Sequence, residues 1–440
     1  MIQKISKWSC YIYIILIPSA GFFGHYLNRN FAGYQISIVD VLPWVAFAAF
    51  AMEFCVRKPP LFQSPVDRWM VVISVVCLFA LWWGRKNGNA HVLVWGLRNT
   101  WTVFLLYFPL AHYIDFDGER RKGLIKFILI YSAIVGLAAI PLRLGLFSSI
   151  VDPVWQAGPL QDFAGATPTY SASYRIAWVC RTTYVDFALG FCLAIVLLGS
   201  RLIFLVINRI GWAVVVGANI VVLLIAKGRG ALLMSACTLA VCGTLLWLKS
   251  SARMQTSMRL AVFVIAGLAV VMGFVYFLED DVLFFLERLS SISLRDRTVN
   301  MRVLTAEKDI ENFLESPVIG KGLGFSDWFW YRDDAMWRRT YGEIGITRML
   351  TWFGGLGTGI IYAFLIWLVV RSLKLIRSTE EPLEKAVGAV CAALVAVMMA
   401  TGLIFVEHAV ILILVAVLLR GKRPKIDATH DNTIRCEQSQ

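Results

Sequence analysis

Residues 350–370 read LTWFGGLGTGIIYAFLIWLVV and contain no charged side chain. A helix of roughly 20 such residues crosses the ~30 Å hydrocarbon core of a bilayer. The whole chain of 440 residues has the same character, with 58% hydrophobic and 16% charged residues and a mean hydropathy of +0.69. This composition excludes a string of soluble domains. We therefore predict an all-α polytopic membrane protein.

Apolar stretches of similar length recur along the chain and predict about twelve transmembrane helices. They fall near 8–24, 37–55, 69–84, 93–113, 123–142, 183–199, 211–226, 231–248, 260–278, 350–370, 386–404 and 408–419. The first stretch follows Lys4 and Lys7, and no small-residue cleavage site clearly follows it. It is therefore interpreted as a retained span and not as a signal peptide.

The basic residues predict the orientation of these helices. Lys and Arg number 42 against 29 Asp and Glu, which gives a net charge of +13. If the N-terminus is cytoplasmic, every cytoplasmic loop carries a basic cluster, at 57–68, 120–126, 201–209, 249–259, 371–385 and 420–425. Cytoplasmic loops are enriched in Lys and Arg in this way. We expect both termini in the cytoplasm and no nucleic-acid partner for the excess charge.

Two segments on the predicted outer side, at about 143–182 and 279–349, are too long to be simple connections. Long loops without a specialised role are uncommon, so function is expected there. The first is expected to form a folded cap. The second holds nine basic and thirteen acidic residues between 279 and 346 and predicts a globular excursion. The chain is then divided into helices one to nine with the cap (1–278), the large periplasmic loop (279–349), the last three helices (350–419) and a cytoplasmic tail (420–440).

One amphipathic helix is predicted inside the large loop. Apolar residues recur at helical spacing until Ser316-Pro317 ends the pattern, namely Val303, Ala306, Ile310 and Phe313. Three glycines follow in alternation, Gly320, Gly322 and Gly324. No strand–turn–helix context surrounds them, so a nucleotide-binding loop is excluded. A tight turn that lets the chain approach a ligand or another helix is the better interpretation.

Arginines on the outer side are candidate anion ligands. Arg229, in Lys227-Gly228-Arg229-Gly230, joins two predicted spans at the outer boundary. It is either an interfacial anchor for lipid headgroups or a ligand whose planar fork matches phosphate oxygens. Arg288, Arg295, Arg297 and Arg302 form a second group. Any one of them could be a solvated surface charge, and Arg302 is preferred because it lies near a helix N-terminus and off the apolar stripe.

Other outward residues have two interpretations each. Trp328 and Trp330 are either interfacial belt residues or stacking platforms for sugar rings. Glu407 and His408 are either a polar turn between the last two spans or part of an acceptor site. The nine cysteines form no CxxC pair, so neither a disulfide framework nor a zinc site is indicated. No metal and no cofactor are expected.

The order of short motifs over about 211–370 resembles the O-antigen ligase and polymerase superfamily. GRGALL (228–233) stands between two spans, the large loop contains R-x(14)-P-x-x-G-x-G-x-G from Arg302 to Gly324, and FGGLG (353–357) opens the next span. The number of predicted spans agrees. Arg175 and Arg181, just before the sixth span, are also similar to the pattern of such proteins.

This resemblance implies a fold of the glycosyltransferase C type and metal-independent, inverting transfer of a glycan from a polyprenyl diphosphate. Arg229 and Arg302 would bind the donor diphosphate, and fixed cations can stabilise the charge of such a leaving group. The partners implied are the lipid-linked glycan, membrane lipid, a flippase and a chain-length regulator.

The chain departs from the ligase pattern at one position. Ligases of this superfamily carry a His-Asn pair about eleven residues before the G-x-x-G, and that count leads to Glu343-Ile344 here. The segment 279–349 contains no histidine. A chain-extending polymerase is therefore favoured over a ligase to lipid A-core. Glu343 is then the candidate general base, unless it only pairs with Arg338, Arg339 or Arg348.

A transporter or flippase for the same lipid-linked glycan is the alternative from another class. Twelve spans is also a transporter count, but transporters of this size are commonly built from two related halves. The sequence shows no such repeat, and the large outward loop interrupts only one half.

The predicted topology is tested by cysteine-accessibility labelling at Asp333 and Asp427. An impermeant thiol reagent should modify Asp333→Cys in intact cells and Asp427→Cys only after permeabilisation, because the basic loops face the cytoplasm. The parent chain with its own cysteines is the control. Labelling of both introduced cysteines in intact cells would contradict the orientation.

Overall fold

The computed structural model describes a set of helices and short segments spread over the chain. The described residues are 2–16, 29–31, 34–36, 38–57, 64–86, 105–114, 118–143, 183–200, 202, 206–225, 229–249, 297–323, 325, 328–331, 336–339, 345–401 and 409–420.

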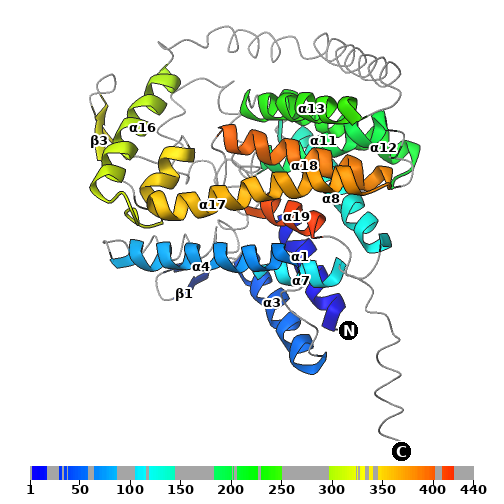
Figure 1. The fold of residues 1–440 in the computed structure, drawn as a ribbon, viewed down its shortest axis with the longest axis horizontal. Coiled ribbons are helices and arrows are strands. Elements are labelled where there is room, and N and C mark those ends of the chain that lie inside the picture. Colours follow the sequence, from blue (N-terminus) through cyan, green and yellow to red (C-terminus); the bar gives the residue numbers. More distant parts are fainter. Residues whose placement is uncertain are drawn as a thin grey trace, which may run out of the picture.

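The described part of the chain is almost entirely helical (Figure 1). The helices of its first part are α1 (Ile2–Leu16), α3 (Ile38–Arg57), α4 (Pro65–Lys86), α7 (Tyr107–Ile114), α8 (Gly118–Arg143), α11 (Thr183–Gly199), α12 (Arg209–Ile225) and α13 (Arg229–Lys249). Those of the second part are α16 (Arg297–Glu315), α17 (Gly345–Ser378), α18 (Pro382–Thr401) and α19 (Ala409–Leu419). Two antiparallel hairpins accompany them, β1 (Arg29–Phe31) with β2 (Tyr34–Ile36) and β3 (Trp328–Tyr331) with β4 (Met336–Arg339).

Three of the described helices are long and apolar enough to cross a membrane. They are Pro65–Lys86, Gly345–Ser378 and Pro382–Met399. Shorter apolar helices cover Val41–Val56, Leu189–Leu198, Ile210–Asn219, Ser235–Leu245 and Val410–Leu419. The prediction of a helical membrane protein is confirmed at this level. The count of twelve spans and the periplasmic loop stay predictions, and the span at 260–278 lies outside the described residues.

The α17 helix is longer than the span that the sequence predicted at 350–370. It continues to Ser378, so Arg371, Lys374 and Arg377 lie on the helix and not in a loop. Lys and Arg are good helix formers, and cations near a helix C-terminus interact favourably with its dipole. At 1.5 Å per residue the 24 residues from Gly355 to Ser378 extend over roughly 36 Å. This length exceeds the ~30 Å hydrocarbon core, so the basic last turns can extend past it.

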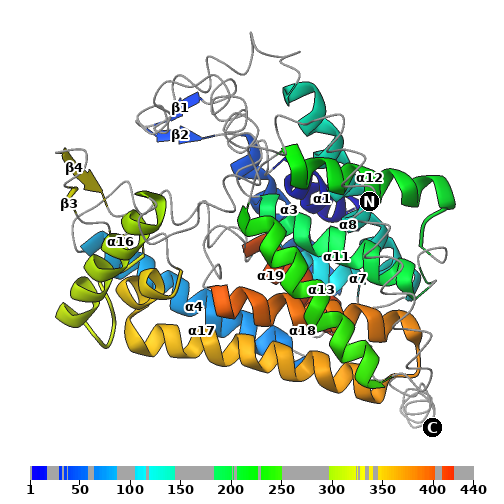
Figure 2. The same cartoon turned by 90° about the horizontal axis from the view of Figure 1, so that it is seen from above.

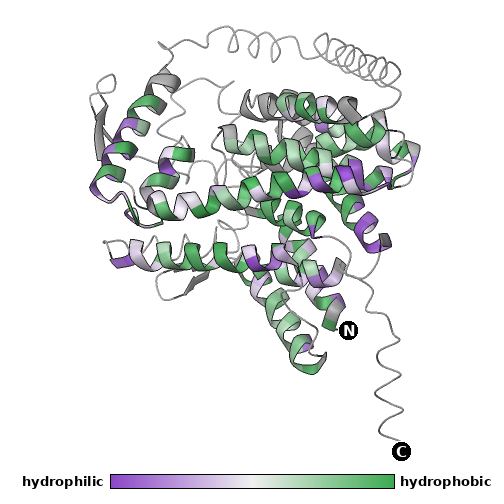
Figure 3. Ribbon diagram, in the orientation of Figure 1, coloured by the Kyte–Doolittle hydropathy of each residue, from purple (hydrophilic) through white to green (hydrophobic). Residues whose placement is uncertain are grey.

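The α18 helix lies among the other long helices. It packs against α17, α13 and α11 (Figure 2). Its side chains from Ala386 to Val395 are nearly all buried, and most are small, such as Ala389, Ala392 and Ala393. Small residues let helix backbones approach closely, which replaces the hydrophobic effect as the packing force inside a bilayer. Figure 3 shows hydrophilic residues along α16 and at the ends of α17 and α18 that lie farthest from α16.

Buried ion pairs join helix ends at the side of the bundle opposite α16. Asp67, only 2% exposed, pairs with Arg420 Nε at 2.9 Å and accepts a hydrogen bond from the Tyr107 hydroxyl at 2.7 Å. Arg121 pairs with Glu384 at 3.0 Å. These contacts bring together the segments 64–68, 118–122, 382–385 and 420, all of which the sequence placed near cytoplasmic loops. The grouping is observed, whereas the side that it faces stays a prediction.

The α17 helix is broken at Gly354, which has φ 65° and ψ −175°. The break leaves the carbonyl groups of the preceding turn without intrahelical partners. The Lys321 amide donates to the Thr351 carbonyl at 2.7 Å, and the Gly322 amide donates to the Trp352 carbonyl at 3.1 Å. The turn after α16, residues 317–323, therefore supplies the donors that the broken helix lacks. We call these residues the glycine turn.

The glycine turn also supplies acceptors for the other side of the break. The Gly355 amide donates to the Pro317 carbonyl at 2.7 Å, and the Leu356 amide donates to the Val318 carbonyl at 3.2 Å. These amides begin the second part of α17 and lack intrahelical acceptors because of the break. The two glycine motifs of the sequence are thus one hydrogen-bonded element.

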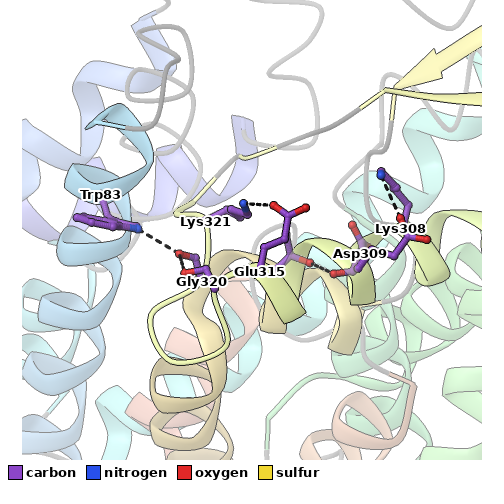
Figure 4. Close-up of polar contacts among 9 residues, drawn as sticks. Trp83, Lys308, Asp309, Glu315, Gly320 and Lys321 are labelled. Carbon is purple, nitrogen blue, oxygen red and sulfur yellow. Dashed lines mark hydrogen bonds and ion pairs between the residues drawn. The ribbon is translucent and has the colours of Figure 1, made fainter.

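The same turn contacts the end of α4. The Leu323 amide donates to the Ala80 carbonyl at 2.8 Å, and Trp83 Nε1 donates to the Gly320 carbonyl at 3.1 Å (Figure 4). A Cβ atom on Gly322 would lie 2.3 Å from Gly84 Cα. The predicted tight turn that approaches another helix is therefore confirmed, and it approaches two helices.

Glycine is required at Gly320, Gly322 and Gly354, because all three have positive φ and backbone atoms close by. A Cβ on Gly354 would lie 2.3 Å from the Val318 carbonyl oxygen, and one on Gly320 would lie 2.5 Å from the Gly354 nitrogen. Backbone atoms cannot move aside as the end of a flexible side chain can. The close approach of α4, the glycine turn and α17 therefore depends on these positions.

Gly354→Ala and Gly322→Ala are expected to lower the melting temperature and yield of the purified protein. The left-handed conformation alone costs an alanine roughly 1–2 kcal/mol, and the clash adds to this. Gly359→Ala is the matched control, because Gly359 lies in α17 with no atom within 4 Å of a Cβ. It should be neutral or stabilising by up to about 1 kcal/mol. Equal melting temperatures for all three variants would contradict the proposed packing.

Candidate functional site

The buried face of α16 is polar. Thr305, Asp309 and Asn312 are only 3–4% exposed, whereas Val303 and Ile310 of the apolar stripe are 42% and 44% exposed. The spacing of Thr305, Asp309 and Asn312 places them on one side of the helix. The sequence predicted the helix and its end at Ser316-Pro317 correctly, but the stripe that revealed it is not the side that is buried. Buried polar groups need partners or a function, so this face is the candidate site.

The first part of α17 provides partners for Asp309. The Thr347 hydroxyl donates to Asp309 Oδ2 at 3.2 Å, and the Thr351 hydroxyl donates to the Asp309 backbone carbonyl at 2.7 Å. Thr347 and Thr351 are one helical turn apart and therefore lie on the same side of α17. Their hydroxyls hold both the side chain and the backbone of Asp309. This explains why a polar side of α16 packs against α17.

Burial changes the acidity of Asp309. Removal from water disfavours the charged form and raises the pKa of the carboxyl from 3.8 to about 6. The hydrogen bond from Thr347 and the charge of Arg348 act in the opposite direction and lower the pKa. The Arg348 guanidinium lies over the Trp352 ring, 5.4 Å from its centre. A carboxyl with a pKa near 6 can hold or release a proton close to neutral pH.

Asn312 carries a buried hydrogen-bond donor without an acceptor. Its Nδ2 atom has no hydrogen-bond partner among the described residues. An unsatisfied buried donor costs roughly 1–3 kcal/mol, so a water or ligand atom is expected to accept from it. Asn312 is three residues after Asp309, so the amide and the carboxyl lie side by side on one face. Together they form a small acid-and-amide site.

The glycine turn closes one end of this site. Lys321 pairs with Glu315 at the end of α16, and its ammonium lies 5.7 Å from the centre of the Phe325 ring (Figure 4). Trp352 Nε1 donates to the Phe325 carbonyl at 2.8 Å. These contacts fix the end of α16 against α17. The site is therefore held at Asp309 and at the C-terminal end of α16.

The residues that the sequence named for the site are only partly described. Arg229 begins α13 and Arg302 lies in the first turns of α16, and their side chains lie outside the description. Trp328 and Trp330 lie in β3. The candidates Arg175, Arg181, Arg288, Glu343, Glu407 and His408 lie outside the described residues. Arg297 and Arg302 are the candidates that the structure places on the same helix as Asp309.

Sequence reasoning missed Asp309 because it followed the apolar residues of α16. The signal was present as polar residues at helical spacing, Arg302, Thr305, Asp309 and Asn312. A polar row of this kind on an amphipathic helix is normally its solvated face. Only the partners on α17 distinguish this buried row from a solvated one.

Other polar clusters and grooves offer less chemistry. A groove of about 590 Å³ lies between α8 and α12, far from α16 in both views (Figures 1 and 2). It is lined mostly by apolar residues such as Ile130, Ile134 and Leu137, with Lys126 as its cation. Among the described residues, no group of three or more His, Cys, Asp or Glu could hold a metal ion. The α16 site is therefore the best-supported candidate.

Comparison with known proteins identifies no relative. No family model matches the sequence, and no curated protein matches it. The functional argument therefore depends on the residues and on their arrangement.

Replacement of Asp309 should change how stability depends on pH. The folded pKa lies above the unfolded value, so ionisation destabilises the folded protein, and the cost grows from about pH 4 to above pH 6. One pKa unit is worth about 1.4 kcal/mol, so the full cost is roughly 2–3 kcal/mol. Asp309→Asn should therefore gain melting temperature over the wild type at pH 7.5 and lose that advantage at pH 4.5. Glu311→Gln changes the exposed side of α16. Its difference in melting temperature from the wild type should be the same at both pH values.

A difference in melting temperature between the wild type and Asp309→Asn that stays constant from pH 4.5 to pH 7.5 would show that Asp309 does not titrate with a raised pKa. The measurement is made on detergent-purified protein and does not depend on any activity.

Proposed function

We propose that this chain is a membrane glycosyltransferase of the glycosyltransferase C type that polymerises polyprenyl-diphosphate-linked oligosaccharide units at the bacterial inner membrane. The products would be surface polysaccharides such as O-antigen, capsule or exopolysaccharide. The observation that carries the proposal is the joining of the glycine turn to FGGLG at Gly354. These are two of the motifs by which the sequence resembles the O-antigen ligase and polymerase superfamily. Their contact supports treating them as one functional unit.

The donor diphosphate is assigned to Arg229 and Arg302. Arg229 is the first residue of α13, and Arg302 lies in the second turn of α16. Backbone N–H groups at the start of α13 favour anions, and the guanidinium of either arginine adds two parallel donors. Charge accumulates on the diphosphate as the glycosidic bond breaks, and fixed cations stabilise that charge without rearranging. Arg175, Arg181 and Arg288 remain further candidates for donor binding.

Sugar binding is assigned to the β3–β4 hairpin. Trp330 of β3 is opposite Trp337 of β4, and Trp328 is two residues before Trp330. Directly opposite residues on paired strands are close neighbours. Aromatic residues grouped in this way support the sugar-stacking interpretation over isolated interfacial anchors.

The reaction forms one bond and breaks another without a redox change. The acceptor hydroxyl oxygen bonds to the anomeric carbon, and the bond from that carbon to the diphosphate oxygen breaks. The leaving polyprenyl diphosphate keeps the electron pair, and the hydroxyl proton passes to a base. Attack opposite to the leaving group inverts the anomeric carbon. The count along the sequence names Glu343 as this base, with Glu407 and His408 as further acceptor-site candidates.

The function is tested on the surface polysaccharide of cells that lack the protein. Loss of all chains longer than one repeat unit, with single units still delivered, is the result expected for a polymerase. Long chains that remain on the polyprenyl carrier would instead identify a ligase. Single units trapped on the cytoplasmic side would identify a flippase. Normal polysaccharide would exclude all three functions.

Arg229→Ala should lower polymer synthesis by about 10- to 100-fold, because a charge-assisted hydrogen bond is worth roughly 1.5–3 kcal/mol. Arg229→Lys should restore activity only in part, since an ammonium lacks the planar fork of the guanidinium. Arg377→Ala is the control, because Arg377 is exposed in the last turn of α17. Polymer is measured at matched protein levels. Wild-type chain length in Arg229→Ala would remove Arg229 from the donor site.

A further inference from the structure

We infer that Asp309, and not Glu343, is the base that takes the proton from the acceptor hydroxyl. This inference rests on the proposed function and names a catalytic residue for it. It is drawn from the buried polar face of α16, which no sequence motif identifies.

The position of the carboxyl suits a base. Thr347 donates to Oδ2, and this is the hydrogen bond that the described residues give to the Asp309 side chain. The second oxygen therefore remains able to accept a proton. Thr351 holds the backbone carbonyl of the same residue at 2.7 Å. A base fixed in this way needs no rearrangement when the reaction occurs.

Asn312 provides a second group that is directed at a ligand. Its Nδ2 atom is buried and lacks an acceptor among the described residues. A hydroxyl that donates its proton to Asp309 can accept a hydrogen bond from this amide. The two side chains together would orient the attacking oxygen. An amide that binds the acceptor sugar would lack a hydrogen-bond acceptor until that sugar is bound.

Arg302 relates this site to the donor. It precedes Asp309 by seven residues of α16, which is two helical turns and roughly 10 Å along the helix axis. A diphosphate bound at Arg302 would place the anomeric carbon and the attacking hydroxyl along this stretch of α16. An inverting reaction needs the base and the leaving group on opposite sides of that carbon.

The charges around Asp309 are compatible with this role. Arg348 of α17 is the charged group that acts on it across the interface. On α16 itself, Lys308 and Glu311 pair with each other at 3.0 Å, and Glu315 pairs with Lys321 of the glycine turn. Burial outweighs the attraction of Arg348, so the pKa is about 6. The carboxyl is then ionised at neutral pH and more basic than an ordinary aspartate.

The proton transfer balances without another reactant. The acceptor hydroxyl gives its proton to Asp309 as its oxygen bonds to the anomeric carbon, and the diphosphate leaves with the electron pair. The protonated Asp309 then returns the proton to water. No electrons are exchanged with a cofactor.

The test uses full-length variants in membranes of the deletion strain, supplied with lipid-linked repeat units. Asp309→Asn should lose about 100- to 10,000-fold in polymer synthesis, the range typical of removing a general base. Asp309→Glu should keep part of the activity. Glu311→Gln, two residues away on the exposed side of α16, is the matched control and should retain wild-type synthesis. Wild-type synthesis should rise with pH through a midpoint near 6.

Catalysis is separated from folding by measuring yield, melting temperature and retention of the lipid-linked donor in each variant. Asp309→Asn should match the wild type in yield and donor retention, melt at no lower a temperature than the wild type, and fail only in polymer synthesis. Substantial polymer from folded Asp309→Asn would overturn the inference, and loss in Glu343→Gln alongside it would return the role to Glu343. If the wild type itself made no polymer from these units, the proposed function would fail first.

Discussion

The break in α17 at Gly354 is the constraint on which this end of the protein depends. A helix that is interrupted leaves donors on one side and acceptors on the other, and the apolar surroundings of a membrane protein offer little water to satisfy them. The glycine turn satisfies both, through Lys321 and Gly322 on one side and Pro317 and Val318 on the other. The two segments therefore stabilise each other's conformation.

This contact fixes α16 relative to the membrane helices. The turn begins directly after α16 and also binds α4 through Ala80 and Trp83. Because the end of α16 is fixed, its Thr305–Asp309–Asn312 face meets Thr347 and Thr351 at the beginning of α17. The raised pKa of Asp309 is a consequence of that packing. A backbone requirement thus creates the chemical environment of a side chain eleven residues before Gly320.

The opposite end of the bundle is stabilised by ion pairs between helix ends. Charges there have opposite charges as partners, as in the buried Asp67 with Arg420 and the partly buried Arg121 with Glu384. The carboxyl of Asp67 is also held by Tyr107. Paired charges of this kind hold helix ends together, whereas Asp309 is only partly satisfied. A buried carboxyl with a raised pKa beside an unsatisfied amide is a candidate for a site.

The sequence alone determined the membrane class, the positions of most helices and the end of α16, because apolar length, periodicity and proline act over a few neighbouring residues. It also singled out the glycines of both motifs. Only the tertiary structure decided that these motifs bind each other, that α17 continues through Arg377, and that the polar side of α16 is buried. Asp309 became a candidate for this reason: its burial depends on Thr347 and Thr351, 38 and 42 residues away. Local sequence patterns cannot reveal partners at that separation, because the pairing is set by how helices meet in space.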